Sequence, residues 1–184
     1  MTFAKPPIPG ATEAQSRHVR QLAVIMLIVT VPTFGFYTFL ALRTGTWQMA
    51  VAAGAVGLYV IGVLVSLRLN NRGNVYQAAD TLIHGIAAAF LVFTLVVAGF
   101  GGLLSLAIVL LAITIGTQTL PANRARTAIL VSIGLSLANL ILDAILPPYR
   151  VTLPELQAYI PIALGLLVVV YVVFFVRQFN TFQF

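Results

Sequence analysis

The sequence is dominated by long apolar runs, each close to the length that crosses a membrane as a helix. A hydrocarbon layer about 30 Å thick requires roughly 20 apolar residues in helical conformation. Six runs reach or approach this length, at about residues 22–42, 47–67, 75–98, 102–120, 127–146 and 159–176. A backbone in lipid must satisfy its own hydrogen bonds, and the runs lack the alternating polarity of barrel strands. They therefore predict transmembrane helices.

The composition also favours lipid as the surrounding solvent. Sixty per cent of the 184 residues are hydrophobic and only 8% are charged, whereas about 25% are charged in a typical soluble domain. A water-soluble domain of this size could not bury so much apolar surface. The predicted fold is all-α, a six-helix transmembrane bundle over residues 21–177. A cytoplasmic segment, 1–20, precedes it, and a cytoplasmic junction, 178–184, follows it.

The positions of lysine and arginine predict how the chain is threaded, because cytoplasmic loops carry an excess of these residues. With the N-terminus inside, the inner segments hold Lys5, Arg17, Arg20, Arg68, Arg72, Arg124, Arg126 and Arg177, and the outer segments hold Arg43 and Arg150. Both termini are therefore expected on the cytoplasmic side. The basic residues form no stripe along one helix, so we expect the lipid bilayer, and no nucleic acid, as their partner.

Two short motifs predict helix starts outside the apolar runs. Ser16 is a candidate cap for a helix that leads into the first run. The segment Thr152-Leu153-Pro154-Glu155 has the spacing of a capping box with proline just inside the helix. It predicts a short helix on the outer side.

Three ionisable side chains lie inside the predicted spans, namely Asp80, His84 and Asp143. Such groups are costly in a membrane and are therefore candidates for a functional site. Asp80 and His84 are four residues apart and share a helix face, and Asn139 and Asp143 repeat this spacing on the fifth run. The helical rise puts His84 and Asn139 near mid-membrane, Asp80 nearer the inner boundary and Asp143 near the outer one.

These four residues allow more than one interpretation. In the first, His84 faces Asn139 in one polar cluster between the third and fifth helices, which senses protons or binds a small ligand. In the second, there are two separate hydrogen-bonding sites that hold the helices together. Ion or proton transport is a third interpretation. The residues alone do not decide, so Asp80, His84, Asn139 and Asp143 are all candidates for ligand or proton sensing.

The residue content argues against several chemistries. Without cysteine there is no disulfide, thiolate metal site or cysteine nucleophile. Lys5, the single lysine, precedes the spans and cannot anchor a Schiff base within them. His84 alone cannot supply the two axial ligands of a bis-histidine haem. We therefore expect no catalytic site, no cofactor and no metal in this chain.

The last predicted helix runs directly into the segment Val176 to Phe184, which has the character of a junction. In this junction and in its helix layout, the chain resembles the N-terminal membrane domain of bacterial sensor histidine kinases and diguanylate cyclases. The resemblance covers the whole chain. It implies a sensory input module of a two-component-type receptor in the bacterial inner membrane, a homodimer, and a kinase or cyclase domain after the bundle.

Two further functions are compatible with the layout. Six helices in about 180 residues also resemble the substrate-binding subunits of energy-coupling vitamin transporters, which dock a partner through small-residue motifs on helix one. Residues 22–42 contain no alanine pair four residues apart, which counts against this function. The third is a structural subunit of a larger membrane complex.

Overall fold

The computed structural model describes residues 12–145 and 150–152, which form an all-α protein with five helices. They are α1 (Glu13–Thr44), α2 (Trp47–Asn71), α3 (Val75–Val96), α4 (Gly101–Thr119) and α5 (Ala122–Ile145). Each is long and apolar enough to cross a membrane. The described chain thus has five such helices where the whole sequence predicts six. The sixth predicted span (159–176), the junction (178–184) and most of the predicted short helix that starts at Thr152 lie outside the described residues.

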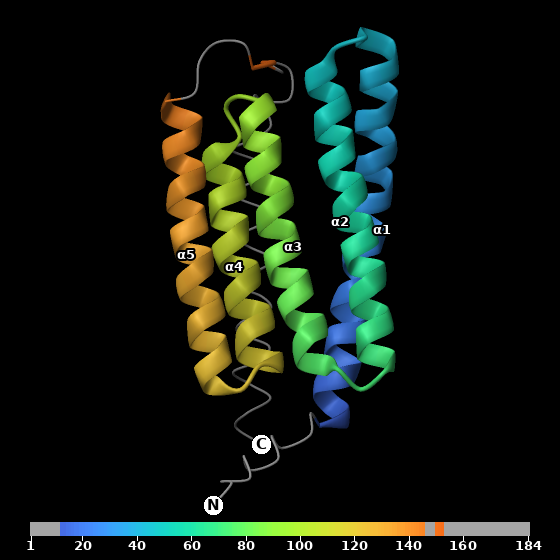
Figure 1. The fold of residues 1–184 in the computed structure, drawn as a ribbon, viewed down its shortest axis with the longest axis vertical. Coiled ribbons are helices and arrows are strands. Elements are labelled where there is room, and N and C mark those ends of the chain that lie inside the picture. Colours follow the sequence, from blue (N-terminus) through green and yellow to red (C-terminus); the bar gives the residue numbers. More distant parts are fainter. Residues whose placement is uncertain (1–11, 146–149, 153–184) are drawn as a thin grey trace, which may run out of the picture.

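The five helices run up and down in one bundle with short connections (Figure 1). Helices α1 and α2 form one antiparallel pair, and α4 and α5 form another. Helix α3 lies between the pairs and contacts all four other helices. A group on α3 is therefore placed where it can influence the whole bundle.

The first helix begins well before its apolar run. Thr12 caps it, since the Thr12 hydroxyl accepts a hydrogen bond from the Gln15 N–H and the Gln15 side chain accepts one from the Thr12 N–H. The helix start at Ser16 that the sequence suggested is therefore wrong. At the other end, Gly45 adopts φ 66°, a left-handed conformation that ends the helix. Polar residues thus extend α1 beyond the hydrocarbon layer.

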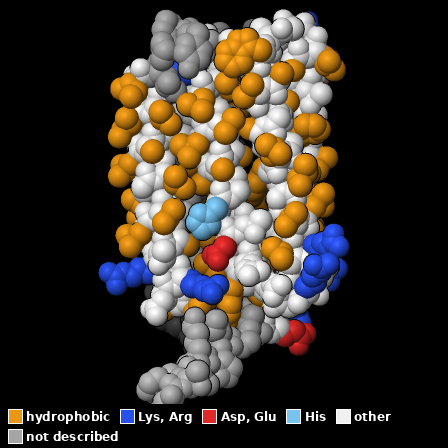
Figure 2. Space-filling view, in the orientation of Figure 1, with side chains coloured by type: hydrophobic (Ala, Val, Ile, Leu, Met, Phe, Trp, Pro, Cys, Tyr) orange, Lys and Arg blue, Asp and Glu red, His pale blue; other side chains and the backbone are white. Residues whose placement is uncertain are grey.

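Apolar side chains cover the outside of the bundle as well as its core (Figure 2). Only 11% of the most apolar stretch of α1 is buried, and Ile28 and Leu42 are largely exposed. Such a surface would aggregate in water and is stable in lipid. The chain is therefore an integral membrane protein, and lipid contact accounts for its outward face.

Six of the eight described arginines gather at one end of the bundle, where α1, α3 and α5 begin. We call this the basic end, and its arginines are Arg17, Arg20, Arg68, Arg72, Arg124 and Arg126. Arg43 and Arg150 lie at the opposite end.

Candidate functional site

The four candidate residues lie in two separate regions. Asp80 and His84 are near the basic end of α3, and Asn139 and Asp143 are towards the opposite end of α5. His84 shares a cleft with Thr127 and Ala128 of α5, more than three turns away from Asn139. The single cluster in which His84 faces Asn139 is therefore wrong.

The error has a simple geometric cause. Helices α3 and α5 both start at the basic end, but α5 begins at Ala122 and not at residue 127. His84 then lies about 14 Å from the start of α3, whereas Asn139 lies about 26 Å from the start of α5. The extra turn at the start of α5 moves Asn139 away from the level of His84.

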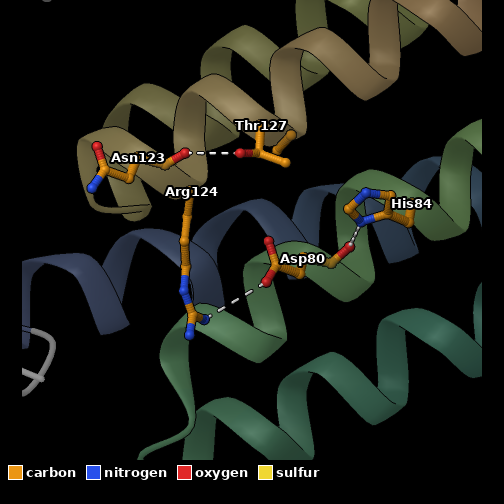
Figure 3. Close-up of a pocket in the computed structure, with 6 residues that line it drawn as sticks. Asp80, His84, Asn123, Arg124 and Thr127 are labelled. Carbon is orange, nitrogen blue, oxygen red and sulfur yellow. Dashed lines mark hydrogen bonds and ion pairs between the residues drawn. The ribbon is translucent and has the colours of Figure 1, made fainter. Parts of the chain in front are cut away.

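A cleft of about 390 Å³ opens between α3 and α5, and we call it the α3–α5 cleft (Figure 3). Its described lining consists of Asp80, His84, Asn123, Arg124, Thr127 and Ala128. The side chains of Asp80 and Arg124 are 36% and 44% exposed, so both charged groups are accessible.

Arg124 reaches from the first turn of α5 to α3. Its Nη1 lies 4.0 Å from Oδ2 of Asp80, and its Cζ lies 5.7 Å from the ring centroid of Tyr76. Tyr76 and Asp80 are four residues apart, so the guanidinium lies near both side chains on one face of α3. A direct charge-assisted hydrogen bond is about 2.7–2.9 Å long. Within residues 12–145 and 150–152, the Asp80–Arg124 pair is therefore a loose ion pair in which both groups keep unused hydrogen-bonding capacity.

His84 continues the same face of α3. Its Nδ1 lies 2.8 Å from the backbone carbonyl oxygen of Asp80. A carbonyl only accepts, so Nδ1 carries the hydrogen, and in the neutral ring Nε2 is an acceptor. The exposed ring thus keeps one acceptor for a group outside the helix.

Asp143 belongs to a different kind of site, at the opposite end. Its Oδ1 accepts from Nη1 of Arg150 at 2.7 Å and from the Gly99 N–H at 3.2 Å, and its Oδ2 accepts from the Gly101 N–H at 3.0 Å. Arg150 also donates to the carbonyls of Asp143 and Thr94, at 2.8 and 3.3 Å. We call this set of contacts the Asp143–Arg150 clamp. It connects the ends of α3 and α5 with the start of α4.

The backbone strengthens the clamp. The Val151 N–H donates to the Val96 carbonyl and the Ala98 N–H donates to the Val151 carbonyl, both at 3.0 Å. The side chains of Arg150 and Asp143 are 7% and 19% exposed. The clamp is thus a mostly buried contact with little capacity for a further ligand.

Asn139 belongs to the packing seam between α4 and α5. Its Nδ2 donates to the Gly101 carbonyl at 3.2 Å and to Ser105 Oγ at 3.1 Å. Ser105 and Ser136 each donate to the other's carbonyl at 3.0 Å. For Asn139 and Asp143, the geometry matches the interpretation of hydrogen bonds that hold helices together.

The sequence did not identify the arginines that pair with Asp80 and Asp143. It indicated only that Arg124 and Arg150 are loop charges that determine the topology. Their presence near the ends of spans that contain Asp80 and Asp143 was the available signal, since a carboxylate in a membrane needs a cation. The sequence also contained an indication of the packing seam. Ser132 and Ser136 precede Asn139 on the same face of α5, and small polar residues on one helix face are typical of a helix–helix contact.

The chain matches no protein family, no curated protein and no solved structure. What the geometry establishes is a polytopic helical membrane protein that has an open polar cleft between α3 and α5 and a closed polar clamp at the opposite end of α5.

Proposed function

We propose that the chain is a membrane-embedded sensory domain, the input module of a signal-transducing receptor, with the α3–α5 cleft as its input site. The observation that carries the proposal is the loose Asp80–Arg124 pair, 4.0 Å apart and accessible. Its groups come from two helices, so a ligand that inserts between them changes the spacing of those helices. A sensor requires a contact of this kind, because a ligand can shift an equilibrium only by binding one arrangement better than another.

The orientation belongs to the same proposal, with the basic end and both termini in the cytoplasm. The six arginines at the basic end support it, because cytoplasmic loops carry an excess of basic residues. Arg150 at the opposite end is paired with Asp143, which reduces the net positive charge there. The cleft then faces the cytoplasmic leaflet. The resemblance to bacterial receptors makes the plasma membrane the proposed location.

The proposed signal is transmitted through α5 because one end of this helix is fixed by the clamp and the other end lies at the cleft. The clamp fixes the opposite end of α5 to α3 and α4. The cleft lies about 28 Å away along the helix, from Arg124 to Asp143. A change of spacing in the cleft therefore tilts α5 about the clamp, and helix shifts of about 1–2 Å are typical of such switches. In a receptor of the kind that the chain resembles, this movement would reach a kinase or cyclase domain.

The absence of cysteine makes this movement measurable, because introduced cysteines can be spin-labelled without removing native ones. One label pair, at Gln77→Cys and Ala122→Cys, reports on the basic ends of α3 and α5. A second pair, at Leu95→Cys and Ala144→Cys, reports on their opposite ends. All four positions are exposed.

The test compares the protein with and without Arg124→Gln. In Arg124→Gln we expect the distance between the two labels at the basic end to change by about 1–2 Å. The distance between the two labels at the opposite end should not change. Arg126→Gln is the matched control, since Arg126 lies about 200° further around α5. Equal distances in Arg124→Gln and in the unaltered protein would overturn the proposed function.

A further inference from the structure

We propose that the α3–α5 cleft binds the head group of a phospholipid that carries both a phosphate and a primary ammonium. In this complex the phosphate pairs with Arg124, and the ammonium donates to Asp80 and to Nε2 of His84. The inference relies on the proposed function only for the cleft's role as the input site. It adds the chemical class of the ligand.

The depth of the cleft fits a lipid head group. Asp80 lies about 7 Å from the start of α3 and Arg124 about 3 Å from the start of α5. Helix α3 has 22 residues and is about 33 Å long, slightly more than the hydrocarbon core of about 30 Å. These charged groups therefore lie near the boundary between the hydrocarbon and the head-group layer.

The lateral position of the cleft points to the same ligand. Figure 2 shows acidic, basic and histidine side chains close together on a side of the bundle that is otherwise mostly apolar. Asp80, Arg124 and His84 are all accessible from outside the protein. Ionised groups that face a membrane are costly unless they are paired. A lipid head group is the polar partner that is always present at this depth.

The charges of the cleft select a zwitterion. Arg124 contributes one positive charge and the Asp80 carboxylate contributes one negative charge, and His84, when its ring is neutral, offers an acceptor through Nε2. A purely anionic ligand would be repelled by Asp80, and a purely cationic ligand would be repelled by Arg124. A ligand with both charges can replace the loose ion pair and satisfy both groups.

Hydrogen bonding then selects a primary ammonium. A phosphate can accept two parallel hydrogen bonds from a guanidinium. A primary ammonium has three N–H donors, which suit the acceptors of Asp80 and His84, whereas a choline has none. The ring of Tyr76, 5.7 Å from the guanidinium carbon, helps to hold Arg124 in position. The donor and acceptor sides of the cleft are therefore arranged before the ligand arrives.

The first experiment measures lipid binding to the unaltered protein by native mass spectrometry. The protein is delipidated in detergent and titrated with phosphatidylethanolamine, its N-methyl and N,N-dimethyl derivatives, and phosphatidylcholine, all with the same acyl chains. We expect affinity to fall along this series by about tenfold in total, as the N–H donors are lost. Equal affinity across the series would overturn the proposal, and this comparison needs no variant to fold.

The second experiment locates the preference in the cleft. Asp80→Asn should abolish the preference for phosphatidylethanolamine over phosphatidylcholine. Arg124→Gln should weaken the binding of both lipids, whereas the control Arg126→Gln should change neither. A preference that survives in Asp80→Asn would overturn the assignment of this site.

Soluble phosphoethanolamine distinguishes the lipid from a free metabolite with the same chemistry. At millimolar concentration it should not displace phosphatidylethanolamine, because it lacks the acyl chains that would contact the apolar outer surface of the bundle. Displacement at equal affinity would overturn the lipid as the ligand. If the lipid binds selectively but the spin-label distances do not change in Arg124→Gln, the sensory function fails and the lipid site stands. If instead the spin-label distances change but the lipids bind without selectivity, the lipid proposal fails and the sensory function stands.

Discussion

The Asp143–Arg150 clamp and the α3–α5 cleft use the same two residue types in opposite ways. Each pairs an aspartate on a membrane helix with an arginine from another segment. In the clamp the two groups are 2.7 Å apart and mostly buried, whereas in the cleft they are 4.0 Å apart and more than a third exposed. The comparison teaches that an ionisable group in a membrane becomes a candidate site only when its hydrogen-bonding capacity is unused.

The energetic consequences also differ. Removing one partner from a buried ion pair typically costs about 3–5 kcal/mol, because the other charge is left uncompensated. An exposed pair contributes only about 0–1 kcal/mol. The clamp should therefore determine stability, and the cleft should be almost neutral for stability and free to bind a ligand.

The largest expected effect comes from Asp143→Ala. It leaves Arg150 without its carboxylate and removes the acceptor of two backbone N–H groups. We expect the free energy of unfolding to fall by about 3–5 kcal/mol, measured by detergent-induced unfolding with the fluorescence of the single tryptophan, Trp47. Arg43→Gln, an exposed arginine at the same end, should change it little. Similar losses in the two variants would remove the distinction between a buried and an exposed charge.

The next effect concerns the close approach of α4 to the clamp. A Cβ added at Gly101 would lie 2.6 Å from Oδ2 of Asp143 and overlap its side chain. Gly101→Ala should therefore destabilise the protein by about 1–3 kcal/mol, the usual cost of overpacking. Gly102→Ala is a matched control, since a Cβ there meets no atom of the described residues within 4 Å. Equal unfolding curves for these two variants would show that the Asp143 side chain moves to accommodate the added Cβ at little cost in stability.

A smaller effect is expected in the seam. Asn139→Leu removes the hydrogen bonds to the Gly101 carbonyl and to Ser105 Oγ while keeping a side chain with the same number of non-hydrogen atoms and the same branching. Interhelical hydrogen bonds in membranes contribute on average about 0.6 kcal/mol each. The same unfolding assay should thus show a loss of about 1 kcal/mol. A loss as large as that of Asp143→Ala would mean that the seam contributes as much as the clamp to the stability of this region.

The smallest effect on stability is expected in the cleft. Arg124→Gln should change the free energy of unfolding by less than about 1 kcal/mol, because the pair is loose and exposed. Arg126→Gln gives the baseline for losing one arginine from the same turn. If Arg124→Gln destabilised the protein as strongly as Asp143→Ala, the cleft would be a second clamp. The contrast on which the proposed function is based would then disappear.

The sequence predicted those parts of the fold that depend on hydropathy. The starts of α2 and α3, at Trp47 and Val75, agree with the predicted runs. The starts of α1 and α5 were placed too late, because their first turns are polar and are fixed by local hydrogen bonds such as those of Thr12. Apolar length shows where a helix crosses lipid but not where it begins.

The candidate site was predictable only in part. The shared face of Asp80 and His84 follows from helical spacing, and the hydrogen bond between them is consistent with it. The partners Arg124 and Arg150 depend on which helices are neighbours and on their relative height, and one sequence does not contain this information. The position of Asn139 was wrong for the same reason, since one additional turn at the start of α5 changed its level.

The clamp has a consequence for biosynthesis. Arg150 follows Asp143 by seven residues, so during translation the carboxylate leaves the ribosome before its cation. Until residue 150 arrives, the carboxylate of Asp143 has the backbone N–H groups of Gly99 and Gly101 as its partners in the clamp but lacks its cation. A chain interrupted between these two positions would expose a recognisable defect to membrane quality-control proteases.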